Sequence, residues 1–355
     1  MTADAIGGVW QYATGLAHDL VRAGWSVDIA LLGPAASTAQ RAQAATDGVT
    51  LLDTGLPLDW LAPDAAVVAT AAVAIADLAR ARGADLVQLN QPALAVADIG
   101  VPVVAVVHSC VASWWDAVEQ GPLPADLAWQ TDLVARGLSR ADAVVCPTRA
   151  FADTVARLYA LPHAPVAIHN GRAPAGPGGP IHDFAFTAGR LWDRGKNVAT
   201  LDRAAARLGI PFKAAGALAG PNGERIAPAH LQTLGQVGDP VIAGCLSARP
   251  VFASAALYEP FGLAVLEAAL AGCALVLSDI PTFRELWDGV ATFVPATDAI
   301  GFADAIEAVA GNPALRAARG TLARERALAY SPDRNAAAMV ALFERVSGAH
   351  RRVAA

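Results

Sequence analysis

Two glutamates bracket a short turn in the C-terminal half of the sequence. Glu259 is followed at once by Pro-Phe-Gly, and seven residues separate it from Glu267, in the pattern Glu-x7-Glu. Proline suits the start of a helix, and glycine lets the backbone approach a ligand closely. The amides of residues 261–263 would then form an anion site at a helix N-terminus. Taken alone, a capped helix with an ordinary surface glutamate explains the stretch equally well.

Glu267 occupies a position at which a charge needs a partner. Leu263, Leu266 and Leu270 mark the buried face of the expected helix, and Glu267 lies at the edge of that face. A carboxylate that is partly removed from water is costly without a compensating group. The sequence therefore predicts that Glu267 has a partner, which is either a ligand or another side chain.

Two cations share one polar loop. Arg190 and Lys196 lie in the glycine-punctuated segment 189–197, between an expected strand and an expected helix. An arginine can bind phosphate oxygens in pairs, and a lysine acts as a point charge, so the two would suit a diphosphate. Either cation alone is more simply a surface charge.

The remaining candidates lie in the first loop or at the ends of expected strands. Gly7-Gly8 opens the chain's first loop, His108 ends a continuous apolar strand, and Asn170 follows the last strand of the first half. A histidine there serves a site near neutral pH or is a satisfied core residue. Trp114 and Trp115, expected in a loop after His108, would stack on a sugar ring or simply pack.

Strands and helices alternate along both halves, which predicts parallel α/β sheets. In such sheets ligands bind beyond the carboxyl ends of the strands, near the point where the strand order reverses. The expected strands of the two halves are 26–32, 49–52, 86–89, 101–107, 143–146 and 166–168, then 184–188, 211–216, 231–234, 250–254, 274–278 and 291–294.

A Pro/Gly-rich run divides the chain into two domains. We expect an N-terminal domain over 1–171, a linker over 172–182 and a second domain over 183–330. Residues 331–355 are expected to form a C-terminal helix that packs back towards the first domain. The cleft between the domains is the default ligand site.

The first half begins with its loop and helix, where an α/β unit normally begins with a strand. Gly7-Gly8 leads into a helix over 9–23, and Met1 stands where the preceding strand should be ending. We therefore expect the first strand to be missing or truncated.

Composition excludes several classes of protein. The net charge of −6 disfavours a nucleic-acid partner, which favours a basic face. The four cysteines are scattered, with no Cys-x-x-Cys pair, so they indicate neither a disulfide framework nor a zinc site, and no other ligand cluster demands a metal. No apolar run approaches the roughly 20 residues that span a bilayer, and no signal peptide is visible. From these features we expect a cytoplasmic location.

Four motifs together resemble those of the family 4 retaining glycosyltransferases. They are the Glu-x7-Glu segment with Pro-Phe-Gly inside it, the Gly-Arg loop followed by Lys-Asn, the histidine after a buried strand, and the N-terminal Gly-Gly pair. The similarity runs over residues 2–346. It implies the α/β GT-B fold: two Rossmann-like, doubly wound parallel-sheet domains that face each other across a cleft.

The resemblance also implies roles for the candidate residues. Glu267 would bind the nucleotide ribose, and Glu259 would lie beside the donor sugar. Arg190 and Lys196 would hold and stabilise the departing diphosphate, and His108 would contact the transferred sugar. The implied donor-binding set is completed by Gly7, Gly8, Asn170, Gln236, Val237, Pro260, Phe261, Gly262 and Leu263.

The implied reaction transfers a hexosyl group from a nucleoside diphosphate sugar to a hydroxyl, with retention and without a metal or other cofactor. The donor base (uracil, guanine or adenine), the donor sugar and the acceptor (glycan, lipid or small molecule) stay open, as does a peripheral membrane contact. An inactive or merely sugar-nucleotide-binding paralogue is the main alternative. A GT-B epimerase or phosphorylase is a third, although neither Lys196 nor Lys213 has the setting of a phosphorylase cofactor lysine.

Overall fold

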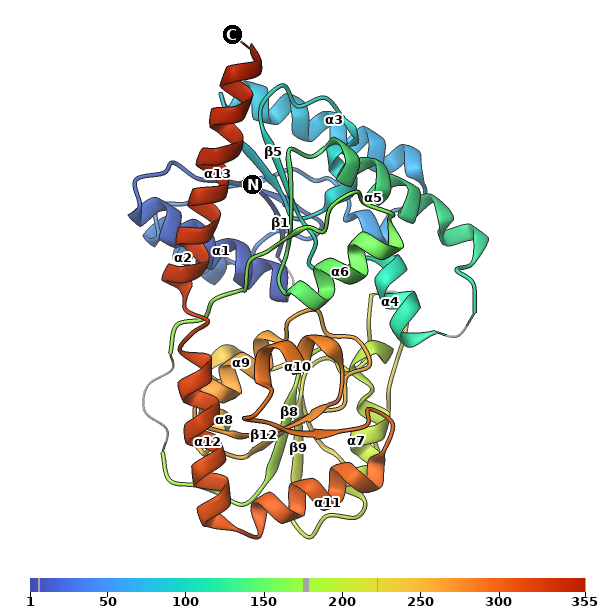
Figure 1. Cartoon of the computed structure of the whole chain (residues 1–355), viewed down its shortest axis with the longest axis vertical. Helices are drawn as coiled ribbons and strands as arrows, with labels where there is room; N and C mark the ends of the chain where they lie inside the picture. The colour runs from blue at the N-terminus through green and yellow to red at the C-terminus, as the bar shows by residue number, and fades with distance from the viewer. Residues whose placement is uncertain (6, 120, 175–178, 222, 355) are drawn as a thin grey trace. The chain divides into compact units, whose positions relative to one another are not determined.

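The chain forms two compact units (Figure 1). The computed structural model describes all residues except 6, 120, 175–178, 222 and 355. One unit comprises Met1–Gly171 and Pro332–Ala355, and the other comprises Arg172–Ser331. Residues 175–178 of the expected linker therefore lie outside the described residues.

The N-terminal unit alternates strands and helices. Its strands are β1 (Thr2–Asp4), β2 (Asp28–Leu32), β3 (Thr50–Asp53), β4 (Val87–Leu89), β5 (Val103–Val106), β6 (Ala143–Cys146) and β7 (Val166–Ala167). Its α-helices are α1 (Gly8–Arg22), α2 (Thr38–Thr46), α3 (Ala65–Ala81), α4 (Val111–Val118), α5 (Ala128–Arg140), α6 (Arg149–Leu158) and α13 (Pro332–Ala354), and its short 3₁₀ helices are η1 (Asp59–Leu61), η2 (Pro92–Val96) and η3 (Ala125–Leu127).

The first strand of this unit is present and has three residues. The sequence predicted it to be missing or truncated; the first alternative is wrong, because three residues are too few to show a strand pattern in the sequence but enough to pair with β2. β1 is fully buried and pairs in parallel with β2, which in turn pairs with β3; β4, β5, β6 and β7 form a second parallel ladder. β1 also lies against β4, so the chain's strand order reverses between these two strands. Loops that leave a sheet at such a point diverge and open a crevice for ligands.

Helix α13 completes the N-terminal core although it lies at the far end of the sequence. Met339, Leu342 and Phe343 recur at helical spacing and are at most 2 % exposed. They join the buried residues of α1 and β2 in one cluster, and α13 lies beside α1 in Figure 1.

The C-terminal unit repeats the α/β alternation. Its strands are β8 (Ala185–Ala188), β9 (Phe212–Ala215), β10 (Gln232–Gly235), β11 (Val251–Ser254), β12 (Ala274–Ser278) and β13 (Thr292–Val294). Its helices are the 3₁₀ turn η4 (Arg194–Lys196), α7 (Val198–Ala205), α8 (Asp239–Ser247), α9 (Leu263–Leu270), α10 (Pro281–Trp287), α11 (Ala299–Ala310) and α12 (Pro313–Ala327).

All strands of this second sheet run in parallel, in the order β10-β9-β8-β11-β12-β13. Strands β9 and β10 follow β8 towards one edge of the sheet, and β12 and β13 follow β11 towards the other edge. The strand order therefore reverses between β8 and β11. The loops that follow β8 and β11 are the loops that carry Lys196 and Glu259. The topology thus brings two candidate segments to one switch point.

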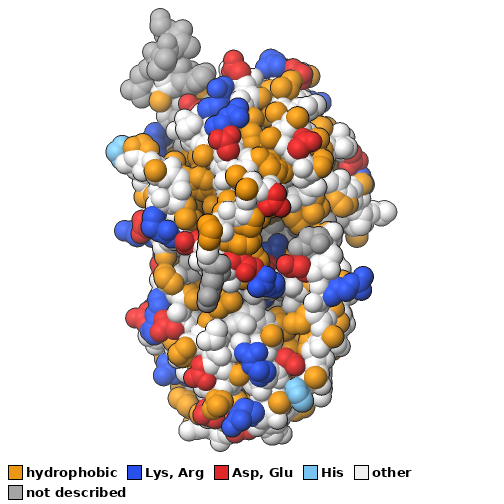
Figure 2. Space-filling view, turned by 90° about the vertical axis from the view of Figure 1, so that its right-hand side faces the viewer, with side chains coloured by type: hydrophobic (Ala, Val, Ile, Leu, Met, Phe, Trp, Pro, Cys, Tyr) orange, Lys and Arg blue, Asp and Glu red, His pale blue; other side chains and the backbone are white. Residues whose placement is uncertain are grey.

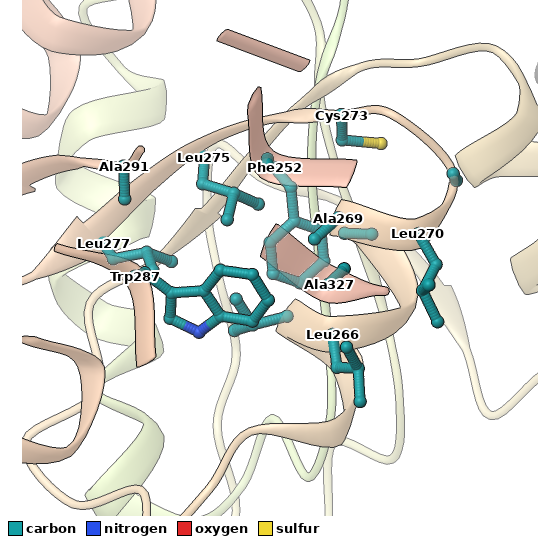
Figure 3. Packing of buried hydrophobic residues seen from close by; sticks show 14 of the residues in the cluster. Phe252, Leu266, Ala269, Leu270, Cys273, Leu275, Leu277, Trp287, Ala291 and Ala327 are labelled. Atoms are coloured by element: carbon teal, nitrogen blue, oxygen red, sulfur yellow. The ribbon is translucent and has the colours of Figure 1, made fainter. Parts of the chain in front are cut away.

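Both faces of the C-terminal sheet are buried. Phe252 belongs to the cluster on one face, and its neighbours Val251 and Ala253 belong to the cluster on the other. Figure 3 shows Phe252 packed with Leu266 of α9 and Ala327 of α12. Helix α9 is therefore fixed to the sheet by its apolar side, which holds its first turn at the strand ends.

Three details differ from the sequence predictions. Trp114 and Trp115 belong to helix α4 and not to a loop. Pro260 does not begin a helix, because α9 starts three residues later, at Leu263. Helices α2 and α8 were not anticipated, because their apolar periodicity is weak and α8 carries Gly244 in its interior. No helix in the described part of the chain is long and apolar enough to cross a membrane.

Candidate functional site

The Glu259 turn is built around a glycine with a left-handed backbone. Gly262 has φ 89° and precedes the first residue of α9. A side chain there would be strained, and its Cβ would lie 3.1 Å from the Phe283 ring. The Thr282 hydroxyl donates to the Glu259 carbonyl oxygen (2.7 Å), which ties the other end of the turn to α10. These two features fix the backbone conformation of the turn, although the turn is not part of a helix or strand.

Lys196 and Glu259 form an ion pair between Nζ and Oε2. Their side chains are 21 % and 16 % exposed. Both line a small cavity of about 20 Å³, roughly the room of one water molecule, together with Gly189 after β8 and Ser254 at the end of β11. The two residues that the sequence placed in separate loops thus meet at the switch point of the sheet.

Backbone bonds hold these two loops together. The N–H groups of Leu257 and Tyr258 both donate to the Gly195 carbonyl oxygen, at 2.9 and 3.1 Å. Asn197, itself left-handed at φ 50°, donates through Nδ2 to the carbonyl oxygens of Ala255 (3.0 Å) and Ala296 (2.7 Å). The Lys196–Glu259 pair therefore lies on two loops that hydrogen bonds connect to each other.

Arg190 points to a different partner. Its Nη2 lies 2.9 Å from Oδ2 of the buried Asp193, and its guanidinium lies 5.7 Å from the centre of the Trp192 ring. The arginine side chain is 52 % exposed. The sequence analysis paired Arg190 with Lys196 in one loop and did not identify Asp193, the carboxylate that holds the guanidinium.

Glu267 has the partner that its position demanded. Nη2 of Arg172 lies 2.9 Å from Oε1 of Glu267. Burial raises the pKa of Glu267, and Arg172 opposes that rise through its charge and a hydrogen bond. Arg172 was assigned only to the linker; the predicted need for a partner was the signal that could have found it.

Gln236 and Val237 follow β10 directly. Gln236 is exposed, whereas Val237 packs against the cluster that contains Leu266. Asp239, at the start of α8, is close enough to Glu267 for its charge to raise the pKa of that carboxyl further. The segment implied to contact the base therefore lies near the carboxylate implied to bind the ribose.

In the N-terminal unit, His108 belongs to a buried polar network. Its Nε2 lies 2.9 Å from Oδ1 of Asn90, which also accepts from Nε2 of Gln88 (3.1 Å). Asn90 donates through Nδ2 to the Thr2 carbonyl oxygen (2.7 Å) and through its backbone N–H to the Thr2 hydroxyl (3.0 Å). These bonds tie His108, Asn90 and β1 together.

The network fixes the protonation of His108. Because Asn90 Nδ2 faces a carbonyl oxygen, Oδ1 must be the acceptor, so the proton of His108 sits on Nε2. Burial lowers the pKa of His108 to about 4. The rings of Tyr12 and His108 form an edge-to-face pair, with 4.6 Å between ring centres. At neutral pH His108 is therefore uncharged, with Nδ1 as a hydrogen-bond acceptor.

The other predicted residues of this unit occupy different settings. Gly7 has φ 76° and caps α1, and Gly8 is the first residue of that helix. Both are exposed, and a Cβ on Gly7 would meet nothing within 4 Å. Asn170 is 6 % exposed after β7. Among the described residues no group of three or more His, Cys, Asp or Glu side chains could hold a metal ion.

Comparison with known proteins matches each half of the chain to a glycosyltransferase family model. Residues 6–174 match the model described as "Glycosyltransferase Family 4", and residues 183–312 match "Glycosyl transferases group 1". Two relatives named phosphatidyl-myo-inositol mannosyltransferase match part of the chain: 38 % identity over 127 residues in Mycolicibacterium smegmatis and 39 % over 90 residues in Mycobacterium leprae. The matches cover 35 % and 24 % of this chain, and only 33 % and 24 % of those relatives' lengths.

Solved structures match almost the whole chain. Sucrose-phosphate synthase from Thermosynechococcus elongatus has a TM-score of 0.77 at 19 % identity, covering 98 % of this chain and 96 % of that one. HepE from Anabaena, solved in complex with UDP-glucose, has a TM-score of 0.70 at 17 % identity and covers 97 % and 100 %. At these identities the likeness shows that the fold is shared.

Proposed function

Because the chain belongs to the family 4 glycosyltransferases, with the GT-B fold, we propose that it is a retaining hexosyltransferase that uses a nucleoside diphosphate sugar as donor. The acceptor is a hydroxyl group of a glycan, a lipid or a small molecule. The observation that carries the proposal is the Lys196–Glu259 pair at the switch point of the C-terminal sheet, with Glu267 on helix α9, which follows the Glu259 turn.

In the proposed reaction the bond between the anomeric carbon and the diphosphate oxygen breaks. A bond from that carbon to the acceptor oxygen forms, and the hydroxyl proton passes to the departing diphosphate. Negative charge grows on the leaving group, so a fixed cation beside it lowers the barrier. Lys196 has three donor hydrogens and can hold Glu259 and a phosphate oxygen together. Arg190, half exposed, is the second proposed cation.

The remaining roles follow the family resemblance. Glu267 is proposed to accept the ribose hydroxyls, and Gln236 and Val237 to contact the base. In the N-terminal unit the neutral Nδ1 of His108 is proposed to accept a hydroxyl hydrogen of the transferred sugar, which an imidazolium would be unable to do. No metal or cofactor has a role in this proposal.

The names of similar proteins suggest which donors to try first. HepE was solved with UDP-glucose, and the mycobacterial relatives are named mannosyltransferases. The first panel therefore contains UDP-glucose and GDP-mannose, with ADP-glucose as the third base. Binding is measured by thermal shift, and donor hydrolysis by release of the nucleoside diphosphate.

The proposal expects one donor to bind and to be hydrolysed slowly, with the released sugar keeping its anomeric configuration in the first NMR spectra. Inversion would contradict retention. Tight binding without any hydrolysis, with acceptor panels also unreactive, would favour the binding paralogue instead.

A further inference from the structure

Arg172 is the first residue of the C-terminal unit, and its side chain reaches back to Glu267 on α9. The two side chains are 21 % and 30 % exposed, so their ion pair is largely shielded from water. The backbone N–H of Arg172 donates to the Tyr330 carbonyl oxygen at 3.1 Å. The ring of Tyr330 packs edge-on against Phe261 of the Glu259 turn, at 6.0 Å between centres. The arginine is thus anchored to the same structure that supports the turn.

The guanidinium of Arg172 has an incomplete set of hydrogen bonds within the described residues. Nε of Arg172 is buried and has no hydrogen-bond partner within the described part of the chain. A buried donor without a partner is unfavourable, because it has given up its hydrogen bonds to water. The guanidinium is therefore oriented by the glutamate and not by a complete set of local bonds.

A carboxylate offers about four lone-pair sites, and the closest approach of Arg172 is to Oε1. Sites remain for two vicinal hydroxyls. We propose that Arg172 is a positioning residue, which orients the Glu267 carboxylate to receive the ribose hydroxyls of the donor nucleotide. This inference rests on the proposed function, because it assumes that Glu267 binds the ribose.

The charges around Glu267 give the inference a pH signature. Burial raises the pKa of Glu267, Asp239 at the start of α8 raises it further, and Arg172 lowers it. Without Arg172 the pKa rises, and the carboxyl becomes protonated as the pH falls towards that value. A protonated carboxyl is a poorer acceptor for hydroxyl groups, so nucleotide binding should then weaken in acid.

The test measures nucleotide affinity, which does not require sugar transfer. UDP, GDP and ADP are titrated calorimetrically into the wild-type protein, Arg172→Gln and Arg172→Lys, at pH 8 and pH 6. The tightest of the three is then compared with its 2′-deoxy form. Arg284→Gln is the matched control, because Arg284 forms ion pairs with Asp279 and Asp288 elsewhere in the same unit.

We expect Arg172→Gln to weaken binding of the ribonucleotide about 10-fold at pH 8, the size of one lost charge-assisted interaction, and by more at pH 6. The 2′-deoxy form should lose much less. Arg172→Lys should recover part of the affinity, Arg284→Gln should behave as wild type, and Arg172→Gln should add nothing in a Glu267→Gln background.

Affinity of Arg172→Gln within twofold of wild type at both pH values, or tighter binding, would overturn the inference. So would an equal loss for ribose and deoxyribose forms, which indicates a general structural defect. If Arg172→Gln does not fold, the lysine variant and the Glu267→Gln background decide by the same ribose-to-deoxyribose ratio. A wild-type protein that binds none of the three nucleotides would instead refute the proposed function, and this inference with it.

Discussion

Lys196 and Glu259 neutralise each other in the free protein, and each is proposed to act on a different part of the donor. Both are mostly buried, so removing one leaves the other as an uncompensated charge. At this scale the proposed chemistry depends on side chains that are paired before the substrate arrives.

Lys196→Ala and Glu259→Gln should each lower kcat at least about 100-fold, the usual size of a lost electrostatic contribution to a transition state. Initial rates with the best donor measure this. Lys213→Ala is the control, because Lys213 stacks on the Phe184 ring at 4.3 Å and lines no part of the cavity. Near wild-type rates in both site variants would sink the mechanism.

Asn90→Asp should raise the pKa of His108 from about 4 to above its ordinary 6.5, because a carboxylate beside Nε2 favours the imidazolium. NMR titration of the imidazole signals measures this, with His108→Gln assigning the resonance. Tyr12→Phe keeps the ring and adds no charge, so its His108 should still titrate near 4. A pKa of His108 near 4 in both variants would contradict the prediction, because it would show that the group at position 90 does not influence the pKa of His108.

At the scale of elements, two glycines let the loops after β8 and β9 pass each other. Gly216 has φ 146°, and a Cβ there would lie 1.7 Å from the carbonyl oxygen of Gly189. Gly189 in turn lines the cavity beside Lys196. Close backbone approach at the strand ends is therefore a condition for the geometry of the site.

Gly216→Ala should lower the free energy of unfolding by about 2 kcal/mol or more, because the backbone must shift to relieve the clash. Gly244→Ala is the matched control: Gly244 lies exposed inside α8 with nothing within 4 Å of its would-be Cβ, so alanine should be neutral or slightly stabilising. Urea denaturation compares the two. Equal free energies of unfolding in the two variants would mean that the loops after β8 and β9 can move apart without cost.

At the scale of the whole molecule, the chain returns to its first unit through α13. Phe343 is 2 % exposed and packs against Trp25 at 5.7 Å between ring centres. Figure 2 shows acidic and basic side chains interspersed over the face in view.

Phe343→Ala should destabilise the N-terminal unit by about 3–5 kcal/mol, the usual cost of truncating a buried phenylalanine. Calorimetry should show a lower midpoint temperature for the unfolding transition of the N-terminal unit. The transition whose midpoint temperature rises on nucleotide binding should not shift. Glu344→Ala, on the exposed side of α13, should change neither. Equal lowering of both transitions would show that the units unfold as one.

The sequence by itself determined the α/β class, because apolar strands and amphipathic helices alternate, and it determined the chemistry of the candidate residues, because only certain side chains bind phosphates or hydroxyls. Strand order and pairing are long-range properties, and only the tertiary structure decided them. It brought Lys196 to Glu259 and Asn90 to His108. It also gave Glu267 its partner Arg172, because residues 95 positions apart meet only when the sheet and its crossing segments are built.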